Sequence, residues 1–278
     1  MRLDAHQHFW AIARGDYGWL TPELTALYRD FGPDDLAPLL AAQGIEGTIL
    51  VQAAPTVAET RYMLALAAEH EMVKGVVGWV DLEQPDAGEV LSDLAAGGGL
   101  VGVRPMIQDI ADDDWMLRPA LTQALKQVAA QGLVFDALTL PRHLPNLRTL
   151  LGRHPDLKVV IDHGSKPQIA AGLFDDWAGD MAELAQTTQA CVKLSGLVTE
   201  AATDWTTEDL RPYVDHLLET FGPHRMVWGS DWPVCTLASS YAQWCDTTEK
   251  LLGTLTQAER AAILGETAMK LYGLDEAR

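Results

Sequence analysis

Two histidines near the start of the chain have the residue type and spacing that metal or acid–base chemistry requires. His6 and His8 stand two residues apart in the segment Asp4-Ala5-His6-Gln7-His8. On a strand, residues at this spacing point to the same face, where two imidazoles can share a metal ion or a substrate oxygen. The alternative for so short a pattern is a pair of unrelated surface histidines.

Asp231 is the strongest single candidate for a general base or a metal ligand. It lies in Gly229-Ser230-Asp231-Trp232-Pro233, directly after the apolar segment Met226-Val227-Trp228. The chain is expected to turn out of a strand here and to expose the carboxylate. A turn-forming or helix-capping aspartate is the alternative interpretation.

A third histidine, His163, follows the apolar run Val159-Val160-Ile161. Its imidazole could complete a ligand set with the first two histidines or polarise a carbonyl group. A histidine with a purely structural role is the alternative. The neighbouring Asp162 is expected to face away from the site.

Two cations interrupt segments that should otherwise be apolar. Arg104 ends Val101-Gly102-Val103-Arg104, and Lys193 lies in Val192-Lys193-Leu194. Either side chain could bind a carbonyl or hydroxyl oxygen of a substrate. Either could equally balance a buried acid such as Asp136.

Tryptophans near the predicted strand ends could form the walls of a pocket, because aromatic faces suit sugar rings. Most buried tryptophans only pack, so one or two are expected in this role, with Trp19 and Trp79 as the candidates. Cys235 follows Asp231 closely, but no local histidine could activate it as a nucleophile. A small buried thiol is the expected role of Cys235.

These residues must be positioned by elements that the hydrophobic pattern predicts. Short runs rich in Val, Ile and Leu alternate with longer amphipathic segments, which indicates βα units around a parallel sheet. The predicted strands are Arg2–His8, Gly47–Gln52, Val73–Val80, Leu100–Arg104, Leu133–Ala137, Lys158–His163, Cys191–Ser195 and Met226–Ser230. Predicted helices between and after them include Ala58–Glu71, Pro119–Ala130, Asp209–Phe221 and Ala258–Leu271.

Eight such units predict an α/β fold of the (β/α)8 TIM-barrel type, with residues 1–278 as a single domain. No glycine-rich dinucleotide fingerprint follows the first strand. In such barrels the carboxyl ends of the strands carry the chemistry, and these ends are polar here. The irregular segment Phe9–Gly32 is expected to cover the active site. The strand ends offer His6, His8, Gln52, Trp79, Asp81, Arg104, Asp136, His163, Lys193, Ser195 and Asp231.

Composition excludes several classes of function. The net charge of -19 opposes binding to nucleic acid and to anionic membranes, so the expected partner is a small-molecule substrate. No secretory signal or membrane-spanning apolar stretch is predicted. The three cysteines have unrelated spacings and suggest neither a disulfide framework nor a zinc ribbon, which favours a cytoplasmic location. The sequence carries no usable mark of oligomeric state.

Four segments together resemble the lactonase branch of the amidohydrolase superfamily, and the resemblance extends over nearly the whole chain. They are Asp4-Ala5-His6-Gln7-His8-Phe9-Trp10, Asp162-His163-Gly164-Ser165-Lys166-Pro167, Lys193-Leu194-Ser195-Gly196-Leu197-Val198-Thr199-Glu200 and Gly229-Ser230-Asp231-Trp232-Pro233-Val234-Cys235. The resemblance implies that His6, His8, His163 and Asp231 line the catalytic centre, with Asp231 as the base that activates water.

The resemblance leaves the metal content open. Binuclear members bridge two metals with a lysine or glutamate from the fourth strand and add histidines from the fifth and sixth. Here Arg104 and Asp136 stand at the fourth and fifth strand ends, so a two-metal site is not expected. One divalent ion, zinc by preference, could be held by His6, His8, His163 and Asp231, and metal-free catalysis is the alternative.

The predicted reaction is the opening of a sugar lactone to its acid, with water activated by Asp231. The carbonyl would be polarised by a metal ion or by the histidines and Arg104. Two alternatives remain at this point: a metal-dependent decarboxylase of the same superfamily, and a catalytically silent barrel that binds a sugar acid or a protein partner.

Overall fold

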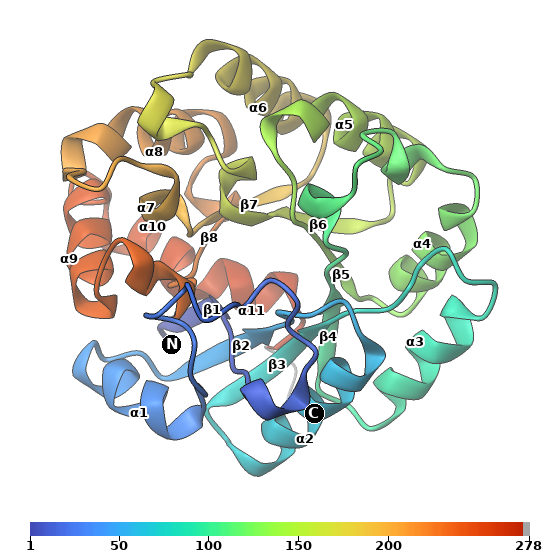
Figure 1. Cartoon of the computed structure of the whole chain (residues 1–278). Coiled ribbons are helices and arrows are strands. Elements are labelled where there is room, and N and C mark those ends of the chain that lie inside the picture. Colours follow the sequence, from blue (N-terminus) through green and yellow to red (C-terminus); the bar gives the residue numbers. More distant parts are fainter. Residues whose placement is uncertain (275–278) are drawn as a thin grey trace.

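Eight short parallel strands form a ring at the centre of the computed structural model, which describes residues 1–274 (Figure 1). Each strand pairs with the next one along the chain. After β8, Asp231 N–H donates to His6 O of β1 at 2.8 Å, and His8 N–H, just beyond β1, donates to Trp232 O at 2.7 Å. These bonds join the last strand to the first, so the predicted (β/α)8 barrel is confirmed. The strands are β1 (Leu3–Gln7), β2 (Gly47–Val51), β3 (Val73–Gly78), β4 (Leu100–Val103), β5 (Val134–Ala137), β6 (Lys158–Ile161), β7 (Cys191–Leu194) and β8 (Met226–Trp228).

All eight predicted strands are present; β5 ends at Ala137 as predicted, and the other seven end one or two residues earlier than predicted. The reason is local: at these ends the backbone leaves the sheet and turns into the loops that carry the polar side chains. Asp231, for example, has a φ of 58°, which no strand residue adopts. The last polar residues therefore belong to the loops rather than to the strands.

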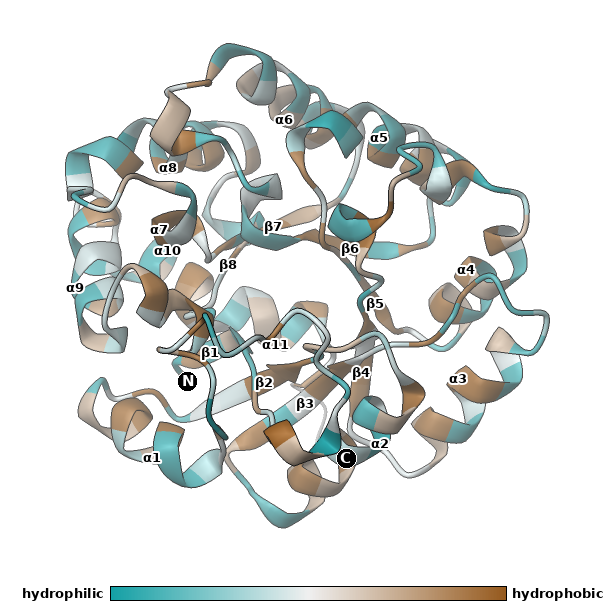
Figure 2. Ribbon diagram, viewed as in Figure 1, coloured by the Kyte–Doolittle hydropathy of each residue, from teal (hydrophilic) through white to brown (hydrophobic). Residues whose placement is uncertain are grey.

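The helices surround the ring, and in Figure 2 hydrophobic and hydrophilic residues alternate around them, as expected for amphipathic helices. A helix follows each strand, as predicted. The helices are α1 (Pro33–Ala42), α2 (Val57–Glu69), α3 (Ala87–Ala96), α4 (Leu121–Ala130), α5 (Leu144–Arg153), α6 (Asp175–Thr187), α7 (Leu197–Glu200), α8 (Thr207–Phe221), α9 (Tyr241–Leu251), α10 (Gln257–Ala261) and α11 (Thr267–Leu271).

The predicted continuous helix Ala258–Leu271 is wrong: α10 and α11 are separated by a π-helical segment, Ala262–Glu266. The interruption lies where the N-terminus crosses the helix. A Cβ atom at Gly265 would lie 2.2 Å from the carbonyl oxygen of Met1, so only glycine allows this approach. Hydrophobic periodicity carries no information about such a crossing.

The barrel interior has two chemically different layers. Toward the amino ends of the strands, apolar residues from all eight strands pack with Ala268 of α11 and with Tyr272, which directly follows α11. In Figure 1, α11 lies behind the ring and closes this end. Toward the carboxyl ends the interior is lined by charged groups and histidines. Within residues 1–274, none of the helices combines the length and apolar character needed to cross a bilayer.

Candidate active site

Four of the predicted residues converge at the carboxyl ends of the strands. The Asp231 Oδ1 atom lies 3.3 Å from His8 Nε2, 3.7 Å from His6 Nε2 and 4.0 Å from His163 Nε2. All four side chains are buried. The structure thus surrounds one carboxylate oxygen, from the loop after β8, with three imidazole nitrogens from β1, the residue directly after it and the loop after β6.

A local irregularity of β1 turns the two histidines inward. Leu3 and Ala5 pack in the apolar layer of the barrel interior. Strict alternation along a strand would turn His6 and His8 away from that interior. The register of β1 against β2 shifts between Asp4 and Gln7, and a shift of this kind re-aims the side chains that follow it.

Left-handed backbone conformations place the other two groups. His163 has a φ of 53° and Asp231 a φ of 58°. Such conformations cost roughly 1–3 kcal/mol for residues other than glycine and are concentrated at functional sites. The histidine ring is fixed further by a hydrogen bond of 2.9 Å between His163 Nδ1 and Ser195 Oγ. Its Nε2 atom is thereby left facing the carboxylate.

The electrostatics of the cluster favour an ionised Asp231. Burial alone would raise the pKa of this carboxyl, but His163, with His8 and His6, holds the pKa well below its usual value. Burial, the largest cause, lowers the pKa of His163 to about 4, against the opposing effect of Asp231. At neutral pH the cluster is therefore a carboxylate, able to accept a proton, beside a neutral His163.

A layer of buried charges supports the cluster from below. Lys193 Nζ lies 2.5 Å from Asp136 Oδ2 and 2.9 Å from Asp162 Oδ1. The hydroxyl of Tyr272 donates to Asp136 Oδ2 at 2.8 Å. A buried ammonium flanked by two carboxylates is the arrangement that makes such burial tolerable.

The expectation that Asp162 faces away is wrong. Its carboxylate points into the barrel, where Oδ2 lies 3.5 Å from Arg104 Nη1 and Oδ1 lies 3.6 Å from His6 Nδ1. Asp162 continues the inward alternation of Val160, which packs in the barrel interior, and the turn that begins directly after β6, with His163 in a left-handed conformation, brings His163 inward as well. Two successive residues therefore both face the site, which alternation along a continuing strand would forbid.

The two cations have different positions. Arg104 lines the pocket, lies within 3.3 Å of His6 Nε2 through Nη1, and donates from Nη2 to the backbone oxygen of Gln52. Lys193 has no exposed surface and lies beneath the pocket rather than in its wall. Lys193 was a candidate for substrate contact or for balancing a buried acid, and the structure places it in ion pairs with Asp136 and Asp162.

A pocket of about 290 Å³ opens above the cluster. This volume is at the lower end of the range for small-molecule sites, about 300–1000 Å³, and suits a ligand of monosaccharide size. Leu24 and Leu27 of the first loop contribute to its wall, so the expectation that Phe9–Gly32 covers the site is confirmed. The lining residues are His8, Trp19, Leu24, Leu27, Ala53, Arg104, Met106, Gln108, Asp109, Leu138, His163, Lys166, Asp231, Val234 and Leu237.

Of the two tryptophans expected in the wall, only Trp19 lines the pocket. Its indole N–H donates to Ala53 O at 2.7 Å, which fixes the ring beside the cluster. Trp79 does not line this pocket. Its backbone N–H donates to Thr60 Oγ1 at 2.8 Å. Sequence reasoning also missed Gln108 and Lys166, two polar wall residues from loops after β4 and β6. Their closeness to Arg104 and His163 in sequence was the available signal.

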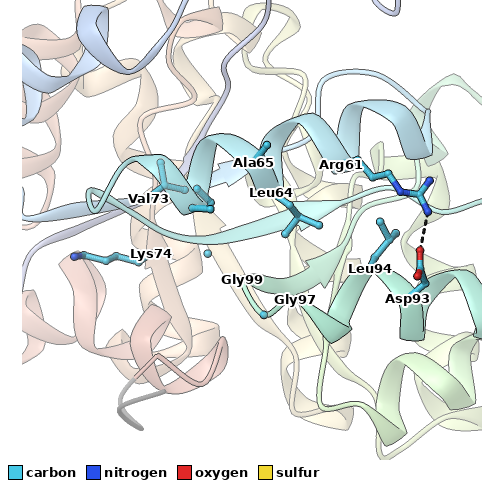
Figure 3. A pocket seen from close by; sticks show the side chains of 13 residues that line it. Arg61, Leu64, Ala65, Val73, Lys74, Asp93, Leu94, Gly97 and Gly99 are labelled. Atoms are coloured by element: carbon cyan, nitrogen blue, oxygen red, sulfur yellow. Dashed lines mark hydrogen bonds and ion pairs between the residues drawn. The ribbon is translucent and has the colours of Figure 1, made fainter.

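A second hollow, of about 510 Å³, lies between α2 and α3 on the outside of the barrel (Figure 3). Small and apolar residues such as Leu64, Leu94 and Gly97 line it. Arg61 and Asp93 form an ion pair of 2.7 Å across one end. The residues that line this hollow include no histidine, and their one carboxylate, Asp93, is paired with Arg61. The hollow is therefore a weaker candidate for a reaction site than the mouth of the barrel.

The donor set at the barrel mouth fits a divalent metal ion. His6, His163 and Asp231 can each offer one ligand atom, and these atoms all lie within 4.8 Å of one another. Two imidazole nitrogens and one carboxylate oxygen are donors that zinc accepts in three-residue catalytic sites. His8 lies outside this set, but its Nδ1 binds Val51 O at 2.8 Å while its Nε2 faces Asp231.

Comparisons with known proteins show which family this chain resembles over its length. The model of the amidohydrolase family matches residues 3–274. A Burkholderia ambifaria protein named L-fucono-1,5-lactonase is 44% identical, covering 99% of this chain and 96% of its own. A Burkholderia multivorans protein of the same name is 38% identical, covering 99% and 97%. The crystal structure of a Burkholderia multivorans amidohydrolase with bound zinc has a TM-score of 0.92 at 37% identity, covering 98% of this chain and 99% of that one.

Proposed function

Because the chain belongs to the amidohydrolase family, we propose that it is a hydrolase that opens a sugar lactone, an aldonolactone of the L-fucono-lactone type, to the sugar acid. The observation that carries this proposal is the carboxyl group of Asp231, which faces three imidazoles at the base of a small pocket. The two full-length relatives named L-fucono-1,5-lactonase support the choice of substrate class.

The reaction needs one proton shuttle. Asp231 takes a proton from water while the oxygen of that water bonds to the lactone carbonyl carbon, and the carbonyl electrons move to its oxygen. When the tetrahedral species collapses, the bond from carbon to the ring oxygen breaks. The alkoxide that leaves receives the proton from the Asp231 carboxylic acid, so the base is regenerated and the open-chain acid is released.

Donors around Asp231 stabilise the negative charge that develops on the carbonyl oxygen. Arg104 brings a permanent cation to the pocket wall, and the buried site strengthens its effect. His163 faces the same space with Nε2, whereas His8 donates from Nδ1 to Val51 O and turns its other ring nitrogen toward Asp231. Trp19 provides a flat apolar wall for the sugar ring, and Lys166 and Gln108 are placed to meet its hydroxyl groups.

His6, His163 and Asp231 are the residues that would hold one divalent metal ion, with zinc preferred by the donor set. Such an ion, when bound, supplies Lewis-acid polarisation of the carbonyl and lowers the pKa of water. The zinc present in the related Burkholderia multivorans structure supports this assignment. The steps assigned to Asp231 are the same with or without it.

A pH-indicator assay of lactone hydrolysis tests the proposal. The panel contains L-fucono-, L-galactono-, L-rhamnono- and D-arabinono-lactones, each with and without a chelator. We expect acid release from at least one of them, and a loss of rate with chelator that zinc restores if the ion contributes. No turnover across the panel would contradict the proposed function, and release of carbon dioxide from an aromatic acid would indicate a decarboxylase instead.

A further inference from the structure

Glu59 is a buried acid that takes no part in the proposed chemistry, yet it binds the loop that follows β2. Its side chain has no exposed surface. The Ala53 N–H donates to Glu59 Oε1 at 3.0 Å and to Oε2 at 3.1 Å, and the Ala54 N–H donates to Oε2 at 2.8 Å. One carboxyl group thus accepts from two consecutive backbone amides, and Ala53 is a residue of the pocket wall.

These contacts differ from the usual ones of an acid at this place in a helix. Glu59 is the third residue of α2, whose N-cap is Thr56. A glutamate at this position commonly accepts from the backbone N–H of the N-cap residue. Here the Thr56 N–H donates to Ala54 O at 2.9 Å instead, and the Glu59 carboxyl extends past the end of the helix. The acid therefore holds the loop rather than the helix.

The first of the two peptide groups links Glu59 to Arg104. The peptide between Gln52 and Ala53 donates its N–H to Glu59, and its carbonyl, Gln52 O, accepts from Arg104 Nη2. The other polar contacts of the guanidinium are 3.3 Å or longer. A peptide group is planar, so a hydrogen bond that holds its N–H also holds the direction of its C=O. Glu59 therefore acts on the guanidinium of Arg104 across a single peptide group.

The second peptide group links Glu59 to Trp19. The peptide between Ala53 and Ala54 donates its N–H to Glu59, and its carbonyl, Ala53 O, accepts from the indole N–H at 2.7 Å. An indole has one donor and no acceptor, so this is the one hydrogen bond that the Trp19 side chain can make. Trp19 is 36% exposed, and packing alone holds its ring less firmly than that of a buried tryptophan. The direction of this carbonyl therefore sets the orientation of the ring.

We infer that Glu59 is a positioning residue of the site: by holding two consecutive peptide groups, it aims Arg104 and Trp19 into the pocket. Glu59 itself does not line the pocket. The inference rests on the proposed function only for the roles of the two side chains, which are charge stabilisation by Arg104 and a wall for the sugar ring by Trp19. Loss of the carboxyl should therefore lower kcat through Arg104 and raise KM through Trp19.

A set of variants separates this role from general stability. Glu59→Ala removes the acceptor and leaves a polar space that water can enter, whereas Glu59→Gln keeps one oxygen that can accept from both amides. Glu59→Asp keeps the acid but is one methylene too short to reach both amides, and it replaces Glu59→Ala if that variant does not fold. The control is Thr256→Ala, which removes the N-cap of α10, a residue that does not line the pocket.

The orientation of Trp19 can be observed without an enzyme assay. Proton–nitrogen correlation spectra of the 15N-tryptophan-labelled chain give one indole N–H signal for each tryptophan, and the Trp19 signal is assigned by its loss in Trp19→Phe. We expect this signal to move in Glu59→Ala and Glu59→Asp, and to keep its position in Glu59→Gln and Thr256→Ala. An unmoved Trp19 signal in folded Glu59→Ala or Glu59→Asp would overturn the inference, whether or not the protein hydrolyses lactones.

Double-variant cycles in the lactone assay test the two links separately. Glu59→Ala and Trp19→Ala should each raise KM about tenfold, and the double variant should raise it about tenfold again rather than the roughly 100-fold expected of independent changes. Likewise, Glu59→Ala/Arg104→Lys should lower kcat no further than Arg104→Lys alone. Effects that multiply in either cycle, or an equal loss in Thr256→Ala, would contradict the inference. A chain whose Trp19 signal responds as expected but which hydrolyses no lactone would refute the proposed function alone.

Discussion

Replacing Gly196 with alanine should disable the site from a position that touches no substrate. Gly196 has a φ of 65°, and a Cβ atom built there would lie 2.5 Å from His163 Nδ1 and 2.7 Å from its Cγ. The left-handed conformation itself costs roughly 1–2 kcal/mol for a residue with a side chain. The ring of His163 must also move away and lose its hydrogen bond to Ser195. A displacement of about 1 Å near a reacting centre can cost about 100-fold in rate.

Gly172→Ala is the matched control. Gly172 has φ and ψ of 65° and 23°, close to the 65° and 1° of Gly196, and a Cβ atom there would meet nothing within 4 Å. Both variants should lose the roughly 1–2 kcal/mol of backbone strain from their free energy of unfolding in urea denaturation, and Gly196→Ala should lose more because it also displaces His163. Only Gly196→Ala should lose about 100-fold in kcat for lactone hydrolysis. A nearly normal kcat in Gly196→Ala, or an equal loss in Gly172→Ala, would refute this reasoning about His163.

Three further outcomes are expected. Burial raises the pKa of Glu59 from 4.5 to about 7. The contribution of Glu59 to the stability of the folded protein is therefore most favourable at low pH, where the carboxyl is protonated, and is lost as the pH rises through 7. In urea denaturation, the free energy of unfolding of Glu59→Gln relative to that of the wild type should rise by up to about 3 kcal/mol between pH 4.5 and pH 8. A difference between the two proteins that does not change with pH would contradict this. Trp19→Ala should raise KM about tenfold with little change in kcat, because its indole forms a wall of the pocket. Arg104→Lys should lower kcat/KM at least tenfold in the same assay, since an ammonium cannot reproduce the guanidinium contacts with both Gln52 and Asp162; full activity would exclude Arg104 from the charge-stabilising role.

The sequence predicted the barrel and four residues of the centre because both depend on simple regularities. Apolar runs of strand length mark the sheet, and a parallel barrel brings the carboxyl ends of all its strands together. His6 and Asp231 are more than 220 positions apart, yet their places at the first and last strand ends suffice to predict that they meet.

The rest depends on geometry that these regularities do not contain. The depth of a side chain in the barrel separates Lys193, which is buried beneath the pocket, from Arg104, which lines it. Asp162 follows the alternation of β6 inward, and the turn after β6 brings His163 inward beside it, against that alternation. Wall residues such as Lys166 come from loops whose paths are set by contacts distant in sequence.

The most direct test of the proposed mechanism is the kcat of Asp231→Asn for the best lactone substrate. The side chain keeps its size but cannot take a proton from water. If Asp231 is the base, kcat should fall by roughly 10²- to 10⁴-fold while the thermal unfolding transition remains cooperative. A folded Asp231→Asn variant whose kcat stays within a factor of about ten of the wild type would contradict the role given to Asp231.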